Sequence, residues 1–294
     1  MVSIKKKKDK KGNLYYYLQQ TVRKKGKVEY KEKYIGKKIP KNIDELKIKL
    51  FRESYKEAYD SIEFIKNNYN KEIKTMEKSI REKSLELFVT IFTYDTQRIE
   101  GSTLSLRETA NLLEKKITPK DKPIEDIREA ENHKKLVYKI LGYKKDLSYN
   151  TILEWHKDLF QDTKPDIAGK IRKYKVGISG SKFIPPLPVE VYPMLIDFFK
   201  WYNKNKNKEK FHPVELAAIV HLKFVTIHPF GDGNGRISRL IMNFVLNKKQ
   251  YPMFNTPYEG RNSYYNALER SQTKNQWNHF LLWFIKNYIK SNKR

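Results

Sequence analysis

The chain contains no cysteine among its 294 residues. Disulfides, thiolate metal sites and a cysteine nucleophile are therefore excluded. Long hydrophobic runs are also missing, because the longest apolar stretches, such as residues 280–285, are far too short to span a bilayer. The basic N-terminus lacks the apolar segment of a signal peptide. We therefore expect no membrane partner and a cytoplasmic location.

Acidic residues are scarce as well: 34 Asp and Glu face 61 Lys and Arg, which gives a formal net charge of +27. Such an excess favours polyanionic partners, namely nucleotides, nucleic acid or acidic surfaces. Much of the excess lies near the N-terminus, because residues 1–42 contain 15 basic and 3 acidic residues. The length and the 39% hydrophobic content suit one large or two small globular domains.

Residues 1–42 form the first predicted domain, a basic β appendage. Residues 1–12 are a lysine run for which we expect no fixed structure. Residues 14–18 and 28–35 are rich in tyrosine and β-branched residues, with Gly26 in a turn between them, which predicts a small β-hairpin or three-stranded meander. Basic side chains between tyrosines could follow a phosphate backbone and stack on bases. A solubilising face is the simpler interpretation, and the one we favour.

The rest of the chain is predicted to be mainly α, with N-terminal helices in residues 43–147 and a catalytic core in residues 148–294. Asn42 with Glu45, and Ser105 with Glu108, have the spacing of capping boxes. A break is expected near residues 67–70, and a helix from about residue 71 is expected to end at Gly101. Further helices are predicted over residues 105–116, 124–141, 148–160, 188–202, 213–227, 236–247, 261–270 and 276–289.

The stretch of residues 228–239, HPFGDGNGRISR, combines groups that suit a polyphosphate. Its small residues let the backbone approach a charged ligand, and the apolar-periodic segment after it predicts a helix whose N-terminus favours phosphate. Arg236 and Arg239 lie three residues apart on one helical face, where both guanidinium groups could bind phosphate oxygens. Asp232 is a hard oxygen ligand suited to Mg²⁺, and His228 can accept a proton near neutral pH.

This stretch resembles the signature of the Fic family (filamentation induced by cAMP), His-x-Phe-x-Asp/Glu-Gly-Asn-Gly-Arg-x-x-Arg, with every fixed position filled. The resemblance implies a helical Fic domain that moves AMP from ATP onto a Ser, Thr or Tyr hydroxyl of a protein. By this analogy His228 deprotonates the hydroxyl, Phe230 anchors the loop, and Asp232 holds Mg²⁺ on the phosphates. The ATP-binding residues that the signature implies are Gly231, Asp232, Gly233, Asn234, Gly235, Arg236 and Arg239.

Residues 96–101, TQRIEG, resemble the inhibitory motif of the same family, Ser/Thr-x-x-x-Glu-Gly/Asn. The resemblance implies an N-terminal inhibitory helix whose Glu100 reaches Arg239 and occupies the guanidinium fork that should hold the γ-phosphate. ATP would still bind, but with its α-phosphate misaligned for attack. An ordinary helix-terminal glutamate paired with a surface lysine is the alternative. The same glutamate could instead position a water molecule that removes AMP.

Residues 169–187 resemble the flap of Fic domains, and the alternation at Tyr174, Val176 and Ile178 suggests a β-hairpin. Its exposed edge would pair with an extended segment of the target and hold the target hydroxyl beside His228. The residues implied in this docking are Val176, Gly177, Ile178 and Ser179.

Tyr264 and Tyr265 match a Tyr-Tyr pair that helps to enclose the nucleotide in relatives. An Asn often follows eight residues after the first of these tyrosines, whereas this chain has Gln272. This departure weakens any inference about contacts with the base.

The leading hypothesis is an autoinhibited AMP transferase that needs ATP and Mg²⁺ and acts on a target protein or on itself. One alternative keeps the same loop but uses another nucleotide, because the signature does not specify the base. A second alternative is a nucleotide-responsive regulator in which Glu100 keeps catalysis off and residues 1–42 bind nucleic acid. The target protein, the removal of AMP and a homodimer that covers Glu100 stay open.

Overall fold

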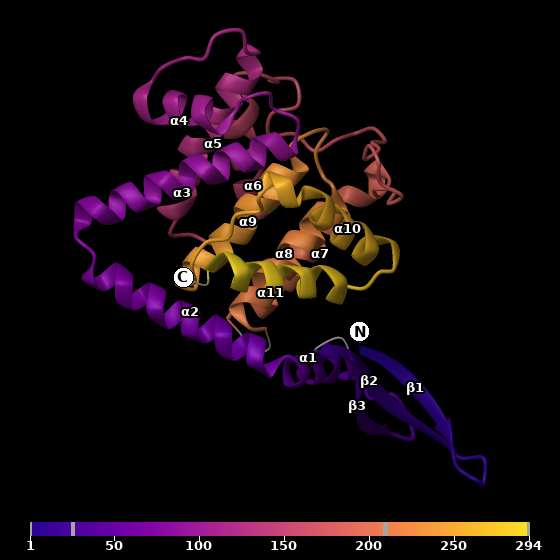
Figure 1. Ribbon diagram of the computed structural model, residues 1–294. Helices are drawn as coiled ribbons and strands as arrows, with labels where there is room; N and C mark the ends of the chain where they lie inside the picture. Colours follow the sequence, from indigo (N-terminus) through magenta and orange to yellow (C-terminus); the bar gives the residue numbers. More distant parts are fainter. Residues whose placement is uncertain (1, 25–26, 208–210, 293–294) are drawn as a thin grey trace. The chain divides into compact units, whose positions relative to one another are not determined.

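The computed structural model describes residues 2–24, 27–207 and 211–292. The chain forms two compact units, Met1–Ile65 and Lys66–Arg294, and helix α2 (Lys56–Thr75) contributes to both (Figure 1). The boundaries of the three predicted domains stay a prediction. In the described part of the chain, no helix has the length and apolar character needed to cross a membrane.

The first unit is a three-stranded antiparallel sheet with a helix on one face. Strands β1 (Val2–Lys8), β2 (Leu14–Lys24) and β3 (Lys27–Gly36) pair in the order β1-β2-β3. Helix α1 (Ile43–Ser54) contacts β1 and β2. Because side chains alternate along a strand, Leu18, Gln20 and Val22 all lie on one face of β2, and all three are buried. Phe51 of α1 is buried as well.

The expected meander is confirmed, but the expectation that residues 1–12 lack fixed structure was wrong. β1 pairs with β2 from Val2 opposite Gln20 to Lys8 opposite Leu14. The Asp9 side chain then orders the turn, because it accepts hydrogen bonds from the backbone N–H groups of Lys11 (2.8 Å) and Asn13 (2.9 Å). The lysine run therefore belongs to an ordered strand and turn. The turn predicted at Gly26 lies outside the described residues.

The second unit is helical, as predicted. After α2 it contains α3 (Lys78–Ile99), α4 (Leu106–Lys115), α5 (Ile124–Leu141), α6 (Tyr149–Phe160), α7 (Pro188–Asn205), α8 (Pro213–Ile227), α9 (Asn234–Lys248), the short 3-10 helix η1 (Tyr258–Gly260), α10 (Arg261–Thr273) and α11 (Asn278–Asn292). α8 and α9 pack against each other at the centre, and α8 is buried on nearly all sides, which explains its almost continuous apolar sequence. α7 and α11 pack on α8, while α3, α5 and α6 pack on α9 (Figure 1).

Two local predictions about the N-terminal helices were wrong. The break expected at residues 67–70 is absent, since α2 continues to Thr75 and α3 begins at Lys78. Asparagine costs a helix only a few tenths of a kcal/mol relative to better formers, so exposed asparagines at 67 and 68 do not end it. Asn42 occupies the N-cap of α1 but its side chain makes no capping hydrogen bond. The capping box of Ser105 and Glu108 is confirmed.

Residues 169–187 do not form the paired strands that the alternation predicted, because no strand is assigned among them. A turn is present, in which the N–H of Ser181 donates to the carbonyl of Ile178 at 3.1 Å. The two arms are tied by a side chain, since Arg172 donates to the carbonyls of Tyr174 (3.0 Å) and Pro186 (2.6 Å). The arms are therefore joined by one guanidinium rather than by a backbone ladder.

Candidate active site

The central feature of the site is the loop that joins α8 to α9. His228 ends α8 with its backbone in the left-handed region (φ 52°), and its N–H donates to the carbonyl of Phe224 at 3.1 Å. Gly233 begins α9, also at positive φ (77°). The first turn of α9 leaves backbone N–H groups without helical partners, and these face the start of the helix, where the dipole is positive. The loop therefore combines an imidazole with an anion-binding helix end.

Buried contacts hold this loop in one shape. Phe230 is fully buried, and Asn234 clamps it: the Phe230 N–H donates to Asn234 Oδ1, and Asn234 Nδ2 donates to the Phe230 carbonyl, both at 2.9 Å. His156 of α6 stacks on the Phe230 ring with centroids 3.8 Å apart. The Gly169 N–H donates to His156 Nδ1 (2.9 Å), so that Nε2 carries the proton and donates to the Asp232 carbonyl (3.1 Å). The loop and the start of the flap are thus fastened to α6.

The His228 imidazole has the protonation state that a general base requires. Its Nδ1 lies 3.3 Å from the carbonyl oxygen of Val225. Because a carbonyl can only accept, Nδ1 carries the proton and Nε2 has a free lone pair. Burial lowers the pKa of His228 below its ordinary value, so the ring is neutral at pH 7. Arg172 fixes the backbone here, with Nε donating to the His228 carbonyl at 2.8 Å.

The glycines of the loop have close neighbours, and at Gly233 a positive φ and the buried Phe160 ring both oppose a side chain. A Cβ on Gly231 would overlap the Tyr174 hydroxyl of the flap. A Cβ on Gly233 would overlap the Phe160 ring, and a Cβ on Gly235 would overlap the Glu100 carboxylate. The last contact is the most informative, because it places a carboxylate against the first turn of α9, where a phosphate would be expected to bind.

Arg239 holds this carboxylate. Glu100 Oε1 lies 2.6 Å from Arg239 Nη2, and the Arg239 side chain is only 1% exposed. Thr96 accepts from Arg239 Nε through its hydroxyl oxygen and from Nη2 through its carbonyl oxygen, both at 3.2 Å. Tyr264, which is itself buried, lies 3.4 Å from Nη1 through its hydroxyl. The contact between Glu100 and Arg239 that the motif implied is therefore present in the structure.

The end of α3 fixes where Glu100 lies. Gly101 follows it at positive φ (105°), the Gly101 N–H donates to the carbonyl of Arg98 (3.2 Å), and the Ser102 N–H donates to that of Gln97 (3.0 Å). These two bonds form a Schellman motif, a common way to end a helix at a glycine. Tyr265 of α10 adds a third restraint, because its hydroxyl donates to the Ile99 carbonyl at 2.9 Å.

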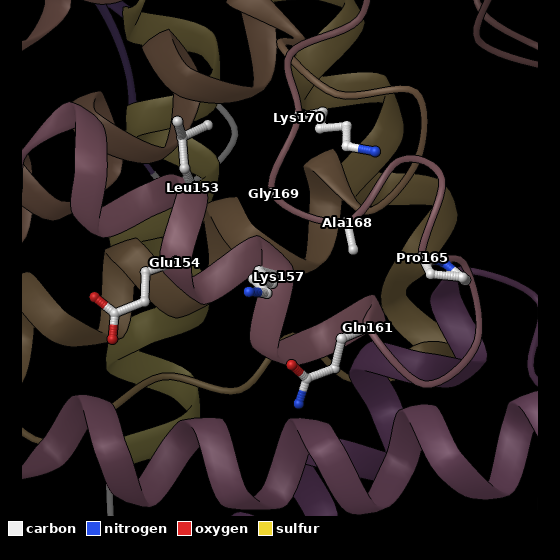
Figure 2. A pocket seen from close by; sticks show the side chains of 8 residues that line it. All are labelled: Leu153, Glu154, Lys157, Gln161, Pro165, Ala168, Gly169 and Lys170. Carbon is white, nitrogen blue, oxygen red and sulfur yellow. The ribbon is translucent and has the colours of Figure 1, made fainter.

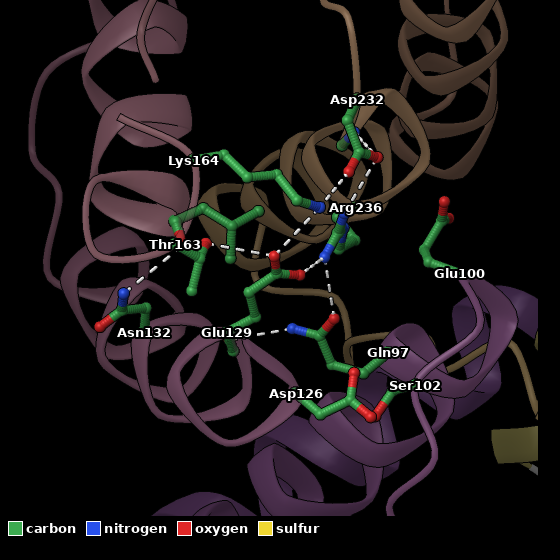
Figure 3. A network of polar contacts seen from close by, with 12 residues as sticks. Gln97, Glu100, Ser102, Asp126, Glu129, Asn132, Thr163, Lys164, Asp232 and Arg236 are labelled. Carbon is green, nitrogen blue, oxygen red and sulfur yellow. Dashed lines mark hydrogen bonds and ion pairs between the residues drawn. The ribbon is translucent and has the colours of Figure 1, made fainter. Parts of the chain in front are cut away.

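Arg236 is engaged differently from Arg239, in a buried polar network (Figure 3). Its Nη1 forms an ion pair with Glu129 of α5 and also donates to Gln97 Oε1 at 3.1 Å. Its Nη2 lies 3.0 Å from Asp232 Oδ1. The sequence pointed to Arg236 as a phosphate ligand; the structure shows it compensated by two carboxylates. Nothing in the sequence pattern identified Glu129 as one of its partners.

Lys164 is a second residue that the sequence did not identify. Its ammonium lies 2.6 Å from Asp232 Oδ2 and 3.2 Å from Glu129 Oε1, which joins the loop to the network (Figure 3). Burial alone would raise the pKa of Asp232, but Arg236 and Lys164 outweigh it and lower the pKa to about 2. Asp232 is therefore ionised at neutral pH, as a metal ligand must be. The described residues contain no group of three or more His, Asp or Glu side chains that could hold a metal by themselves.

The flap residues Val176, Gly177, Ile178 and Ser179 are exposed or half-buried at its turn. The flap is fastened next to this turn, because Glu269 of α10 accepts from the Ser181 hydroxyl (2.9 Å) and the Lys182 N–H (2.8 Å). The predicted tyrosine pair divides: Tyr264 lies in the core, where its hydroxyl is 3.0 Å from His221 Nε2, while Tyr265 is 44% exposed. Gln272 donates to the Thr226 hydroxyl at 3.3 Å.

A surface hollow of about 520 Å³ lies between α6 and residues 165–170, where the flap begins. Figure 2 shows its lining, which comprises Leu153, Glu154, Lys157, Gln161, Pro165, Ala168, Gly169 and Lys170. None of these residues belongs to the 228–239 stretch, and the side chains include both charges. We therefore assign the hollow no part in the chemistry of the loop.

Comparison with known proteins agrees with this geometry. The model of the Fic/DOC family matches residues 146–246. The protein adenylyltransferase Fic of Drosophila yakuba is 35% identical over 179 residues, which cover 60% of this chain and 36% of that protein. The protein of the same name from Drosophila melanogaster gives the same values. The chain thus spans about a third of the length of these curated relatives.

Solved structures share the fold over most of the chain. A Fic domain containing signaling protein from Bacteroides thetaiotaomicron superposes with a TM-score of 0.71 at 26% identity, covering 79% of this chain and 95% of that one. A fragment of Fic-1 from C. elegans gives a TM-score of 0.68 at 28% identity, covering 83% of this chain and 71% of that one. The similarity therefore extends well beyond residues 146–246.

Proposed function

We propose that this chain, which carries a Fic/DOC family domain over residues 146–246, transfers AMP from ATP to a hydroxyl group of a protein and inhibits itself through Glu100. The name of its curated relatives, protein adenylyltransferase, supports the reaction type. The target is a Ser, Thr or Tyr side chain of another protein or of the chain itself.

One observation carries this proposal: a carboxylate from the end of α3 already lies against the first turn of α9. The Glu100 carboxylate is in contact with Gly235 in the first turn of α9 and with the buried guanidinium of Arg239. A carboxylate and a phosphate oxygen make the same kind of charge-assisted hydrogen bond with a guanidinium. The loop and Arg239 therefore form a site for an anion, and the terminal phosphate of a nucleotide fits the place that Glu100 now takes.

The chemistry follows from the protonation state of His228. Its Nε2 accepts the proton of the target hydroxyl as the hydroxyl oxygen bonds to the α-phosphorus of ATP. The bond from that phosphorus to the oxygen bridging to the β-phosphate breaks, and pyrophosphate leaves. The rigid placement of His228 by Arg172 and Val225 suits a reaction that depends on alignment rather than on strong acid or base.

The residues present fit Mg²⁺ as a cofactor. Asp232 offers one ionised carboxylate, and Mg²⁺ typically takes one or two protein carboxylates and fills its other positions with phosphates and water. When bound, the ion would neutralise charge on the phosphates. Lys164 and Arg236 now contact this carboxylate, so they would have to share it or turn aside.

Self-inhibition follows from competition for Arg239. While Glu100 holds the guanidinium, a γ-phosphate cannot form the same hydrogen bonds, and the α-phosphate lacks the alignment that in-line attack needs. The flap would supply the remaining alignment by pairing residues 176–179 with an extended target segment. Its arms leave backbone groups for such pairing, because they form no ladder with each other.

The test is incubation of wild type and the Glu100→Gly variant with ATP, GTP, UTP and CTP, each labelled at the α-phosphate. Label transferred from ATP to protein is expected, with more from the variant. Transfer from another nucleotide instead would change the assigned substrate. All four nucleotides are compared because Gln272 stands where relatives often have Asn. No transfer from any of the four by either protein would refute the enzymatic proposal.

A further inference from the structure

The open face of the N-terminal sheet carries a set of tyrosines and lysines that the active site does not use. Leu18, Gln20 and Val22 turn toward α1, so the alternate residues of β2, among them Tyr15 and Tyr17, lie on the opposite face. Residues directly opposite one another in an antiparallel pair share a face. The register therefore places these tyrosines beside residues of both neighbouring strands.

β1 contributes Lys5, opposite Tyr17, and Lys7, opposite Tyr15, while β3 contributes Tyr34, opposite Tyr17, and Tyr30, opposite Thr21. We call this set, Lys5, Lys7, Tyr15, Tyr17, Tyr30 and Tyr34, the tyrosine–lysine face. Tyr30 is 62% exposed and Tyr34 is 51% exposed.

The rings and the charges are interleaved. The Tyr34 ring lies 5.3 Å from that of Tyr17 and 6.2 Å from that of Tyr15, centroid to centroid. The Lys7 ammonium lies 4.7 Å from the Tyr17 ring, and that of Lys37 lies 5.8 Å from the Tyr15 ring. Large aromatic surfaces therefore lie within reach of ammonium groups, which is the arrangement that stacks bases and contacts the phosphates between them.

The acidic residues of this segment offset only part of its positive charge, although Glu32 lies on the tyrosine–lysine face itself, opposite Gln19. Of the three in residues 1–42, Asp9 is used in the β1–β2 turn, where it also accepts from the Tyr15 hydroxyl. Glu32 pairs with Lys7 (2.6 Å) and accepts from Gln19 (2.9 Å). Fifteen basic residues accompany these three, so that the ordered turn and the face form a strongly positive surface.

We propose that the tyrosine–lysine face binds single-stranded nucleic acid, with bases stacked on Tyr30 and Tyr34 and phosphates held by Lys5 of the face and by Lys37, which lies beside the Tyr15 ring. Charge complementarity argues for a polyanion, and the exposed rings argue for unpaired bases, because bases inside a duplex already stack on each other. A solubilising face needs lysines but has no use for tyrosines that are more than half exposed. This inference is independent of AMP transfer and does not depend on the active site.

The 294-residue chain is titrated against a fluorescent 12-nucleotide single strand of thymidines, and anisotropy is followed at 50 and 200 mM salt. Binding is expected to weaken with salt, and Lys5→Gln with Lys37→Gln should flatten the log–log slope by about 1.4, at about 0.7 per phosphate contact. The matched charge control is Lys120→Gln with Lys290→Gln, on the surface of the second unit. It should leave the slope unchanged.

Tyr30→Ala separates stacking from simple charge attraction. It should weaken binding about tenfold, because base–aromatic stacking contributes about 1–3 kcal/mol per base, whereas Tyr30→Phe keeps the ring and should bind nearly as the wild type does. Equal binding of Tyr30→Ala and wild type, equal or tighter binding of the same sequence as a duplex, or preference for anionic vesicles would overturn the proposal. So would an absence of binding at 50 mM salt. Thermal unfolding of each variant checks that the fold is intact.

Discussion

Replacing Glu100 by glycine should raise the rate of AMP transfer, and the structure gives the size of the effect. The substitution removes the carboxylate that lies 2.6 Å from Arg239 Nη2. Because Arg239 is buried, water cannot solvate its guanidinium fully, so the vacated group should take up a phosphate oxygen instead. A hydrogen bond to a charged group contributes about 1.5–3 kcal/mol net.

If that competing interaction is what misaligns ATP, its removal lowers the barrier by a similar amount. At about 1.4 kcal/mol per tenfold, the expected acceleration is about 10- to 150-fold. Glu100→Gln should give a smaller increase, because the amide keeps a hydrogen bond to Arg239 but not the charge. The position is compatible with glycine, since Glu100 is the cap residue of α3 rather than part of its interior.

The assay is transfer of α-labelled AMP to protein, with ATP affinity measured separately by calorimetry. Glu82→Gln, at an exposed position on the same helix, is the matched control and should leave the rate unchanged. Thermal unfolding confirms that each variant is folded at the assay temperature. An unchanged rate in folded Glu100→Gly that still binds ATP would refute self-inhibition, whatever the distance between Glu100 and Arg239.

Three further predictions concern pH, the metal and the flap. Burial lowers the pKa of His133 to about 3 and that of His156 to about 4, so below pH 6.5 the unfolded chain binds protons that the folded chain does not. Each of these two histidines should therefore lower the free energy of unfolding by about 2 kcal/mol between pH 7 and pH 5. A urea unfolding midpoint that does not move over this range would contradict the prediction. Lys164→Met removes a partly exposed partner of the Asp232 carboxylate and should tighten Mg²⁺ binding about fivefold. Calorimetry in the presence of a non-hydrolysable ATP analogue measures this affinity. Weaker binding would show that the lysine does not compete with Mg²⁺ for the carboxylate. Gly177→Pro should reduce modification of a protein target at least tenfold while ATP affinity stays the same, and intact modification would rule out strand pairing at the flap.

The signature could be read from the sequence because its parts are local. The loop, the glycines and the start of α9 lie within twelve consecutive residues, so their spacing is visible in the sequence. The pairing of Glu100 with Arg239 joins residues 139 positions apart, and only the resemblance to a known motif pointed to it. The partners of Arg236 had no such guide, because Glu129 and Lys164 lie in segments whose sequences are typical of solvated helices and turns.

The flap and the first strand failed for a related reason. Alternation at Tyr174, Val176 and Ile178 predicted paired strands, but no strand is assigned there, and the Arg172 side chain joins the arms through the carbonyls of Tyr174 and Pro186 instead. The lysine run indicated disorder because charge repulsion opposes a compact chain, yet pairing with the tyrosine-rich β2 and the Asp9 turn outweighs it. In both cases specific side-chain and strand-pairing contacts, which residue periodicity and charge do not reveal, decided the outcome.

Helix α3 contacts the two arginines at the start of α9 by different means, and this difference bears on how the proposed inhibition would be relieved. Thr96 and Glu100 contact Arg239, whereas Gln97 contacts Arg236. Rotation of one side chain is enough to withdraw the Glu100 carboxylate, but Thr96 contacts Arg239 partly through its backbone carbonyl, so its release requires the helix itself to move. Withdrawal of the Glu100 carboxylate should therefore free the Arg239 guanidinium for a phosphate while Thr96 of α3 still orients it. The proposed inhibition could then be relieved without movement of the helix.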